Sequence, residues 1–220
     1  MILHLVTDRQ RLAGRVPFED ARRCLLGQAQ HAIDAGIDCI IVRERDLEAR
    51  DLVQLTIDLV KRTRGTRTRV VVSDRVDVAL ASGADGVHLR ADSIRPEAVR
   101  RMTPDGFLLG RSVHGAEEAA ALTSVDYVIA GTVWASASKP DHHRLLGLDG
   151  FAEVVKASRV PVLAIGGVTV DRVQDVASAG GAGIAAIGLF IGGTGQCRAV
   201  PLEGIAAEAR ARFDTSRSGS

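Results

Sequence analysis

Aromatic side chains are scarce in this chain, which has five Phe, one Trp and one Tyr among 220 residues. Proteins that bind single-stranded nucleic acid stack its bases on aromatic side chains, so a surface of that kind is not expected. Excess charge is also lacking, because acidic and basic residues nearly cancel to a formal net charge of +1. No basic region would attract nucleic acid, and no acidic tail indicates a charged partner. We therefore expect no nucleic-acid partner.

Long apolar runs are missing as well. No run is long enough to cross a membrane, and the N-terminal stretch MILHLVTDRQ lacks the pattern of a signal peptide. We therefore expect a cytoplasmic protein with no membrane partner. The sequence leaves the oligomeric state open, a homo-oligomer included.

Cysteine is rare, and the three present are Cys24, Cys39 and Cys197. Their number is odd, and their spacing matches neither CxxC nor a metal-binding pattern. We interpret all three as reduced thiols, the usual state in the cytoplasm. A catalytic thiol is the alternative, and it is disfavoured because none of the three follows a predicted strand as His114 does.

Short apolar runs rich in Val and Ile recur along the chain. They do not alternate with polar residues, so both faces of each run are expected to be buried, as in a parallel sheet. The runs span residues 2–6, 39–42, 69–73, 86–89, 107–110, 127–131, 160–167 and 183–188. Segments with helical spacing lie between and after them, at 19–35, 49–63, 75–82, 95–102, 116–123, 149–158, 170–179 and 200–213. This order predicts an α/β fold with a parallel sheet.

A second regularity predicts that the sheet closes. A helix end, a turn and a strand recur as AGIDCIIV, SGADGVHL and AGGAGIAAIG, and SVDYVIAG repeats the pattern without the glycine. Gly36, Gly83 and either Gly180 or Gly181 fit the left-handed position after a helix. Four such units suit a single (β/α)8 TIM barrel, which an open sheet would not explain. We expect this barrel over residues 1–213, followed by a disordered polar tail at 214–220.

Barrel enzymes place the active site at the carboxyl ends of the strands, so the residues that follow each strand are the candidates. Glycine-containing segments, in which backbone amides are accessible, follow the last two strands, at Gly166 and Gly167 and at Ile187 and Gly188. Amide groups there commonly bind phosphate, and a missing Cβ lets the anion approach. The alternative is a pair of tight turns without a ligand. Two such sites on adjacent strands favour phosphate.

Basic residues after other strands indicate a second anion site. Arg43 and Arg45 alternate along an extended segment, so both can face one side, and Lys139 lies in the long loop after the sixth strand. The alternative is ordinary solvated surface charge. Asp74 is a candidate for Mg²⁺, or for an ion pair with Arg75 or Arg45.

Histidines are the remaining candidates. The stretch FLLGRSVHG places His114 just after a strand, where it is either a general acid/base aimed into the pocket or a loop residue bonded to backbone. The residues alone do not decide between these two. His88 lies within a strand and is interpreted as structural. His142 and His143 lack a third ligand and are weak evidence for a metal.

The motifs together resemble those of the thiamin phosphate synthase / thiazole tautomerase superfamily over residues 2–210. They occur in order as HLVTD, VRER, SDRVDVAL, SGADGVHL, GRSVH, DYVIAGTVW, SASK, PVLAIGGV and GIAAIG. The resemblance implies a (β/α)8 barrel of thiamin biosynthesis that acts on a small phosphorylated thiazole. Two activities occur in the superfamily, a synthase and a tautomerase.

The synthase branch joins a pyrimidine diphosphate to a thiazole phosphate with Mg²⁺ and releases pyrophosphate. Its Q-L-R-E-K pattern stands here as Ile41 to Arg45, and its H-[LV]-G-Q-x-D pattern leaves Ser93 at the position of the metal-binding aspartate, with Asp92 one residue early. Gly188 replaces the usual serine. In favour of the synthase, its T-P-T-K pattern stands here as Ser136 to Lys139, which keeps both hydroxyl groups and the amine. Ser112 also matches the synthase pattern. The implied substrate-binding residues are Ser112, Ser136, Ser138 and Lys139, besides Arg43 and Arg45.

The tautomerase branch carries R-E-R and G-R-S-V-H, both of which stand here unchanged, and its histidine corresponds to His114. The resemblance therefore predicts a thiazole tautomerase that aromatises the carboxylated thiazole phosphate through His114, without a cofactor. The alternative is thiamin phosphate synthase, with Mg²⁺ held by Asp74 and Asp92. A third reading is a non-catalytic barrel that binds thiazole or thiamin phosphate.

Overall fold

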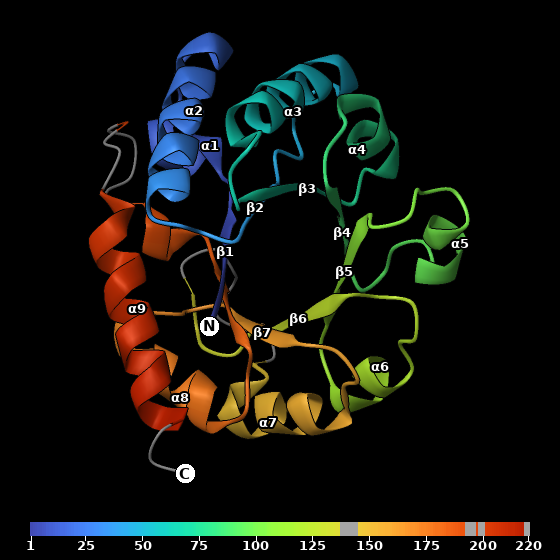
Figure 1. The fold of residues 1–220 in the computed structure, drawn as a ribbon, viewed down its shortest axis with the longest axis vertical. Coiled ribbons are helices and arrows are strands. Elements are labelled where there is room, and N and C mark those ends of the chain that lie inside the picture. Colours follow the sequence, from blue (N-terminus) through green and yellow to red (C-terminus); the bar gives the residue numbers. More distant parts are fainter. Residues whose placement is uncertain (137–144, 192–196, 198–200, 218–220) are drawn as a thin grey trace.

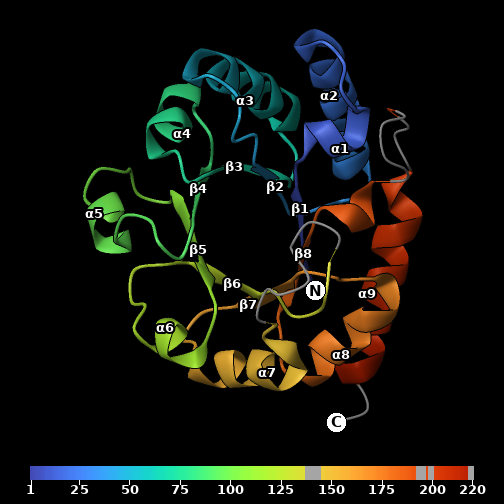
Figure 2. The same cartoon turned by 180° about the vertical axis from the view of Figure 1, so that it is seen from behind.

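The short apolar runs form eight parallel strands that close into a barrel in the order β1 to β8 (Figure 1). The computed structural model describes residues 1–136, 145–191, 197 and 201–217. The strands are β1 Ile2–Val6, β2 Cys39–Val42, β3 Arg69–Ser73, β4 Gly86–Leu89, β5 Leu108–Val113, β6 Tyr127–Gly131, β7 Val162–Ile165 and β8 Gly183–Ala186. The barrel closes where Ile2 of β1 pairs with Gly183 of β8. The opposite view shows the same circular order (Figure 2). The predicted (β/α)8 barrel is confirmed.

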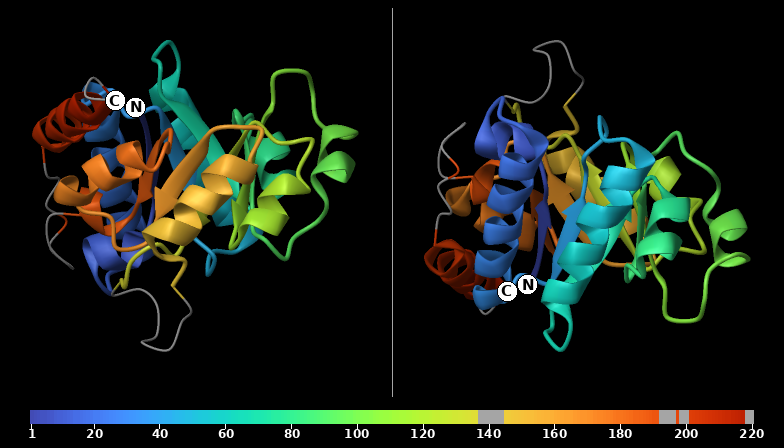
Figure 3. Two further views of the ribbon diagram at one scale, coloured as in Figure 1. Left: turned by 90° about the horizontal axis from the view of Figure 1, so that it is seen from below. Right: turned by 90° about the horizontal axis from the view of Figure 1, so that it is seen from above.

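Helices surround the strands and cover the outside of the barrel (Figure 3). Within the described residues they are α1 Arg9–Ala13, α2 Phe18–Asp34, α3 Ala49–Thr63, α4 Val76–Ser82, α5 Pro96–Arg100, α6 Ala116–Ala120, α7 Gly147–Ala157, α8 Val173–Ser178 and α9 Leu202–Arg217, with 3-10 turns at Val170–Arg172 and Gly188–Phe190. Helix α9 lies between α2 and α8, so the last helix completes the ring beside the first long one.

The first and last helices differ from the sequence prediction. Helix α1 was not predicted, because five residues are too short to show helical periodicity; it begins where the Asp8 side chain accepts a hydrogen bond from the Arg11 N–H. Helix α9 runs to Arg217, so residues 214–217 of the predicted disordered tail are helical. Ala206, Ala209 and Phe213 bury the inner face of α9, which favours the continued helix.

The core has two layers because alternate strand residues point to opposite sides. Ile40 and Val42 of β2 pack outward against helices, whereas Cys39 and Ile41 pack inside the barrel. The predicted helix-ending glycines have positive φ, at 65° for Gly36, 68° for Gly83 and 81° for Gly180. Of the described helices, none has the length and apolarity that a bilayer span requires.

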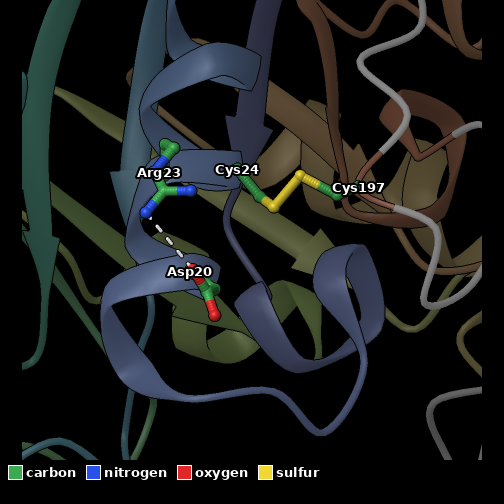
Figure 4. The surroundings of a disulfide bond; sticks show 4 residues. All are labelled: Asp20, Arg23, Cys24 and Cys197. Carbon is green, nitrogen blue, oxygen red and sulfur yellow. Dashed lines mark ion pairs between the residues drawn. A yellow bond between two sulfur atoms is a disulfide. The ribbon is translucent and has the colours of Figure 1, made fainter.

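The cysteines depart from prediction, since Cys24 of α2 and Cys197 form a disulfide across 173 residues of sequence (Figure 4). Their Cα atoms are 5.4 Å apart. Barrel closure brings the segment after β8 beside α2, and sequence spacing does not show this proximity. The interpretation of these two as reduced thiols is therefore wrong. Cys39 is free and buried inside the barrel, and burial raises the pKa of its thiol far above the ordinary value.

Candidate functional site

A cavity of about 1180 Å³ opens at the carboxyl ends of the strands, and residues that end or follow all eight strands line it. Most of the predicted site residues meet there, as a parallel barrel requires. Those lining the cavity are Arg43, Arg45, Asp92, Ser112, His114, Ser136, Gly166, Gly167, Ile187 and Gly188. Asp74 lines a smaller cavity of about 230 Å³, which shares Arg45, Ser73 and Arg90 with the large one. Ser138, Lys139, His142 and His143 lie outside the described residues.

The glycine-rich side of the cavity follows β7 and β8. Gly166 and Gly167 have φ of 97° and 63°, and a Cβ on Gly167 would lie 2.4 Å from the Ala135 carbonyl oxygen. Packing against the segment after β6 therefore requires these glycines, independently of any ligand. Gly188 differs, because its added Cβ would meet only the Arg11 Nη2 atom, at 3.3 Å.

Two arginines that sequence reasoning missed flank these glycines. Arg172 donates a hydrogen bond to the Gly167 carbonyl oxygen at 2.6 Å, and its guanidinium lies 5.2 Å from the centre of the Trp134 ring. Arg11 projects from α1 toward Gly188, and both arginines line the cavity. The only sequence signal for Arg11 would have been the capping residue Asp8 that starts α1.

The arginine side of the cavity follows β2, where residues 43 to 45 alternate in direction. Glu44 is buried and pairs with Arg9, with 3.0 Å between Oε2 and Nη1. Arg43 and Arg45 line the cavity. Burial lowers the pKa of the Arg45 guanidinium, and the neighbouring charges of Arg43 and Arg90 lower it further. The positive charges on this side are therefore close enough to repel one another.

Asp74, Asp92 and Arg90 form one charged cluster beside these arginines. The Asp74 Oδ2 accepts a hydrogen bond from Arg90 Nε at 2.7 Å, and its Oδ1 accepts one from the Arg90 backbone N–H at 3.3 Å. Asp92 Oδ1 is 3.5 Å from the same Nε. The alternative of an ion pair with Arg75 or Arg45 is wrong, because Asp74 pairs with Arg90 at 2.7 Å and Arg75 pairs with Asp77 at 2.6 Å.

The same cluster bears on metal binding. Burial raises the pKa of Asp74, but hydrogen bonds from Ser93 and Arg90 outweigh burial, so the net pKa is lowered and the carboxyl is ionised. Within the described residues no three His, Cys, Asp or Glu side chains are grouped as a metal site. Mg²⁺ uses one or two carboxylates together with substrate phosphates. The two carboxylates available here already face the Arg90 guanidinium, so an added cation does not fit between them while Arg90 holds its place.

Histidines lie on the floor and at the rim of the cavity. His88 is within β4, as predicted, and its Nε2 lies 2.9 Å from Ser112 Oγ. Burial lowers the pKa of His88 to about 4. At the rim, His114 Nδ1 lies 2.5 Å from the Gly131 carbonyl oxygen, so Nδ1 carries the proton and the ring is fixed at this nitrogen. Its backbone N–H donates to Glu118 at 2.8 Å.

Comparison with known proteins identifies the family. The sequence pattern of the family described as thiamine monophosphate synthase matches residues 3–190. The chain belongs to this family. A thiamine-phosphate synthase of Methanoregula boonei is 38% identical over 192 residues, which cover 86% of this chain and 85% of the relative. A putative thiamine-phosphate synthase of Geobacter sulfurreducens is 35% identical and covers 86% of both chains.

Solved structures agree with the fold. Thiamine phosphate pyrophosphorylase from Pyrococcus furiosus superposes with a TM-score of 0.78 at 28% identity, covering 98% of this chain and 96% of the other. A 3-hexulose-6-phosphate synthase superposes with a TM-score of 0.70 at 20% identity and shows the shared barrel alone.

The tautomerase prediction is wrong, because the thiamine-phosphate synthases in this comparison share 33–41% identity with most of the chain. The prediction rested on the short stretches RER and GRSVH. Within these stretches Glu44 is bound to Arg9, and His114 Nδ1 is bound to the Gly131 carbonyl oxygen, whereas Arg43, Arg45 and Ser112 line the cavity. The family enzyme supported for this chain is a synthase of thiamin biosynthesis.

Proposed function

We propose that this protein is a thiamin phosphate synthase that joins a pyrimidine diphosphate to a thiazole phosphate. In the reaction, the lone pair of the thiazole ring nitrogen forms a bond to the methylene carbon attached to the pyrimidine ring. The carbon–oxygen bond to the diphosphate breaks, and its electron pair leaves on pyrophosphate. The transfer therefore needs two sites for phosphorylated groups in one cavity, with the two reacting atoms between them.

The observation that carries this proposal is the pair of cationic regions on different sides of one cavity. Arg11 and Arg172 follow β1 and β7 and flank the glycines, whereas Arg43 and Arg45 follow β2. Pockets for one drug-sized ligand hold about 300–1000 Å³. The cavity of about 1180 Å³ exceeds that range, so its size suits two substrates better than one.

The proposed roles follow from position. The thiazole phosphate binds at Gly166, Gly167, Ile187 and Gly188, where Arg11 and Arg172 supply positive charge. The diphosphate binds at Arg43 and Arg45, and Ser112, His114 and Ser136 line the space between. Ser138 and Lys139 are proposed substrate contacts from the sequence pattern alone. Mg²⁺ is the metal that the resemblance implies, and no step is assigned to it, because Asp74 and Asp92 both face Arg90.

An assay on the purified protein tests this function. With both substrates present, thiamin phosphate and pyrophosphate should appear in equal amounts, and omission of either substrate should abolish both. The assay is run with Mg²⁺ and again with EDTA, so that the metal requirement does not decide the outcome. Failure to form thiamin phosphate under either condition would refute the proposal.

An Arg11→Ala variant tests the two-site arrangement. Loss of a charge-assisted contact should raise KM for the thiazole phosphate about tenfold or more and leave KM for the pyrimidine diphosphate within about twofold. Arg15→Ala removes the same charge from an exposed position just beyond α1 and should change neither KM. An equal rise in both KM values for Arg11→Ala would mean that the glycine side is not a separate phosphate site.

A further inference from the structure

We propose that the Arg90 guanidinium, held between Asp74 and Asp92, binds the diphosphate of the pyrimidine substrate directly and supplies there the positive charge of a divalent metal. The inference rests on the proposed function, because it assigns a ligand group to one side of the same cavity. Arg90 follows β4 and lines both the large and the small cavity.

Asp74 holds Arg90 at two points, on its side chain and on its backbone. Asp74 receives hydrogen bonds from both the side-chain Nε and the backbone N–H of Arg90, at 2.7 and 3.3 Å. Asp92 approaches the same Nε at 3.5 Å from the side of the large cavity. Asp74 is itself anchored, because its backbone N–H donates to the His88 carbonyl oxygen at 2.9 Å. A guanidinium held in this way loses little freedom when an anion binds.

The donors that Arg90 retains suit a phosphate. In the described part of the chain, its side chain makes one hydrogen bond, through Nε. A guanidinium has five N–H donors in a planar fork, so the two terminal amino groups remain for an oxyanion. Paired donors of this kind bind phosphate in a bidentate manner.

The surrounding charge favours an anion at this position. Burial, followed by the charges of Arg43 and Arg90, lowers the pKa of Arg45, and the charges of Asp74 and Asp92 offset only part of this. Among the described residues, neither Arg43 nor Arg45 forms an ion pair with a carboxylate. Three guanidinium groups therefore lie on this side of the cavity, and the two carboxylates, which form ion pairs with Arg90 alone, also act on Arg45 through their charge. A diphosphate would relieve the repulsion among the three.

Inorganic pyrophosphate, which is also the expected product, is the probe. Calorimetry on the full-length protein in EDTA should show binding, and Mg²⁺ should tighten it by less than about threefold. Arg90→Gln should weaken binding in EDTA by about tenfold or more, as loss of charged hydrogen bonds predicts. Arg90→Lys should retain part of the affinity because it keeps the charge. Arg101→Gln removes an equal charge from an exposed position after α5 and should leave affinity within about twofold.

A second readout does not depend on activity or on pyrophosphate. Mn²⁺ titration followed by electron paramagnetic resonance should show no bound ion in the parent protein, because Arg90 occupies the two carboxylates. Arg90→Gln frees Asp74 and Asp92 and should gain Mn²⁺ binding, and circular dichroism confirms that each variant is folded. Two results would overturn the inference: pyrophosphate binding by the parent that requires Mg²⁺, or equal affinity of Arg90→Gln and parent in EDTA.

The two proposals fail separately. If the parent forms thiamin phosphate but needs a divalent metal to bind pyrophosphate, the role of Arg90 is refuted and the synthase stands. If pyrophosphate binds in EDTA through Arg90 and no thiamin phosphate forms, the anion site stands and the synthase is refuted.

Discussion

At the residue scale, His4 and His88 are buried inside the barrel beside Tyr127. His4 of β1 packs edge-on against the Tyr127 ring, with 4.9 Å between ring centres, and His88 stacks on the same ring with 5.6 Å between centres. His4 Nδ1, His88 Nδ1 and Tyr127 Oη are buried without a hydrogen-bond partner in the described residues. A charged imidazole in this setting would be costly, so both rings are neutral.

This cluster predicts the acid dependence of stability. Burial, followed by the charge of His88, lowers the pKa of His4 to about 3, and burial lowers that of His88 to about 4. Both histidines titrate near 6.5 in the unfolded chain. Above pH 6.5 neither affects the pH dependence. Below it, the unfolded chain takes up protons that the folded protein excludes, so the free energy of unfolding falls until each folded-state pKa is reached.

Urea unfolding between pH 7.5 and pH 4 measures this effect. Each histidine should lower the free energy of unfolding by up to about 1.4 kcal/mol per pH unit below pH 6.5. His4→Leu removes one of the two groups, so its curve should fall less steeply over the same interval. Parallel curves for parent and variant would show that His4 does not exclude a proton when folded.

At the scale of elements, the local sequence predicts the bounds of most strands correctly, and the predicted bounds are wrong where a strand is extended by pairing with a neighbour. Strands β1, β2, β3, β4 and β6 have the predicted bounds, because short Val- and Ile-rich runs leave no other structure that buries both faces. Strand β5 runs three residues beyond the predicted Gly110, because Arg111 to Val113 pair with β6. Polar residues that pair with a neighbouring strand give no apolar signal.

The candidate site was predictable to the same extent. The mouth of the barrel and most of its lining follow from strand order. The ion-pair partner of Asp74 could not be predicted from strand order. Arg75 is adjacent to Asp74 in sequence and Arg90 pairs with it in the fold, and the backbone conformation at Asp74 determines which of them its side chain meets. At Asp74 the backbone has φ of 64°. Arg11 was missed because its position depends on the short helix α1 and on contact with Gly188.

The pairing of β1 with β8, which closes the barrel, predicts that Gly183 tolerates no larger side chain. A Cβ added to Gly183 would lie 1.9 Å from the Ile2 carbonyl oxygen, a backbone atom that strand pairing holds in place. Gly183→Ala should therefore destabilise the protein by about 2 kcal/mol or more, as overpacking does. Gly27→Ala in α2 is the matched control, since nothing lies within 4 Å of its added Cβ. That control should stabilise by about 0.5–1 kcal/mol.

Urea unfolding of both variants at pH 7.5 measures the difference. A Gly183→Ala protein as stable as the parent would mean that the β1–β8 pairing yields easily. The close approach of the Ile2 and Gly183 backbones would then not limit the size of the side chain at position 183.

At the scale of the whole molecule, one covalent bond joins distant parts of the chain. The disulfide links α2 to Cys197, whose backbone N–H also donates to the Leu12 carbonyl oxygen of α1 at 3.2 Å. Helix α1 carries Arg11 toward Gly188. The outer helices and the glycine side of the cavity are therefore held by the same cross-link.

Reduction should lower stability because a long loop opens in the unfolded chain. Disulfides contribute typically about 2–4 kcal/mol, and more for longer loops. The parent protein in dithiothreitol should thus unfold at a lower urea concentration than the oxidised protein. A Cys24→Ser/Cys197→Ser variant should match the reduced parent and should not respond to dithiothreitol. A shift of equal size in that double variant would assign the effect to Cys39 or to the reagent.

The pairing of Ile2 with Gly183 also sets an order of events during synthesis. Strand β1 leaves the ribosome before the other seven strands, but one of its edges acquires its partner only when β8 has been made, some 180 residues later. At about 5–20 residues per second, that edge waits about 10–35 seconds. Throughout this time the nascent chain exposes one unpaired edge of a strand that is apolar except for His4, which is the kind of segment that chaperones shield and that neighbouring chains on a polysome can capture.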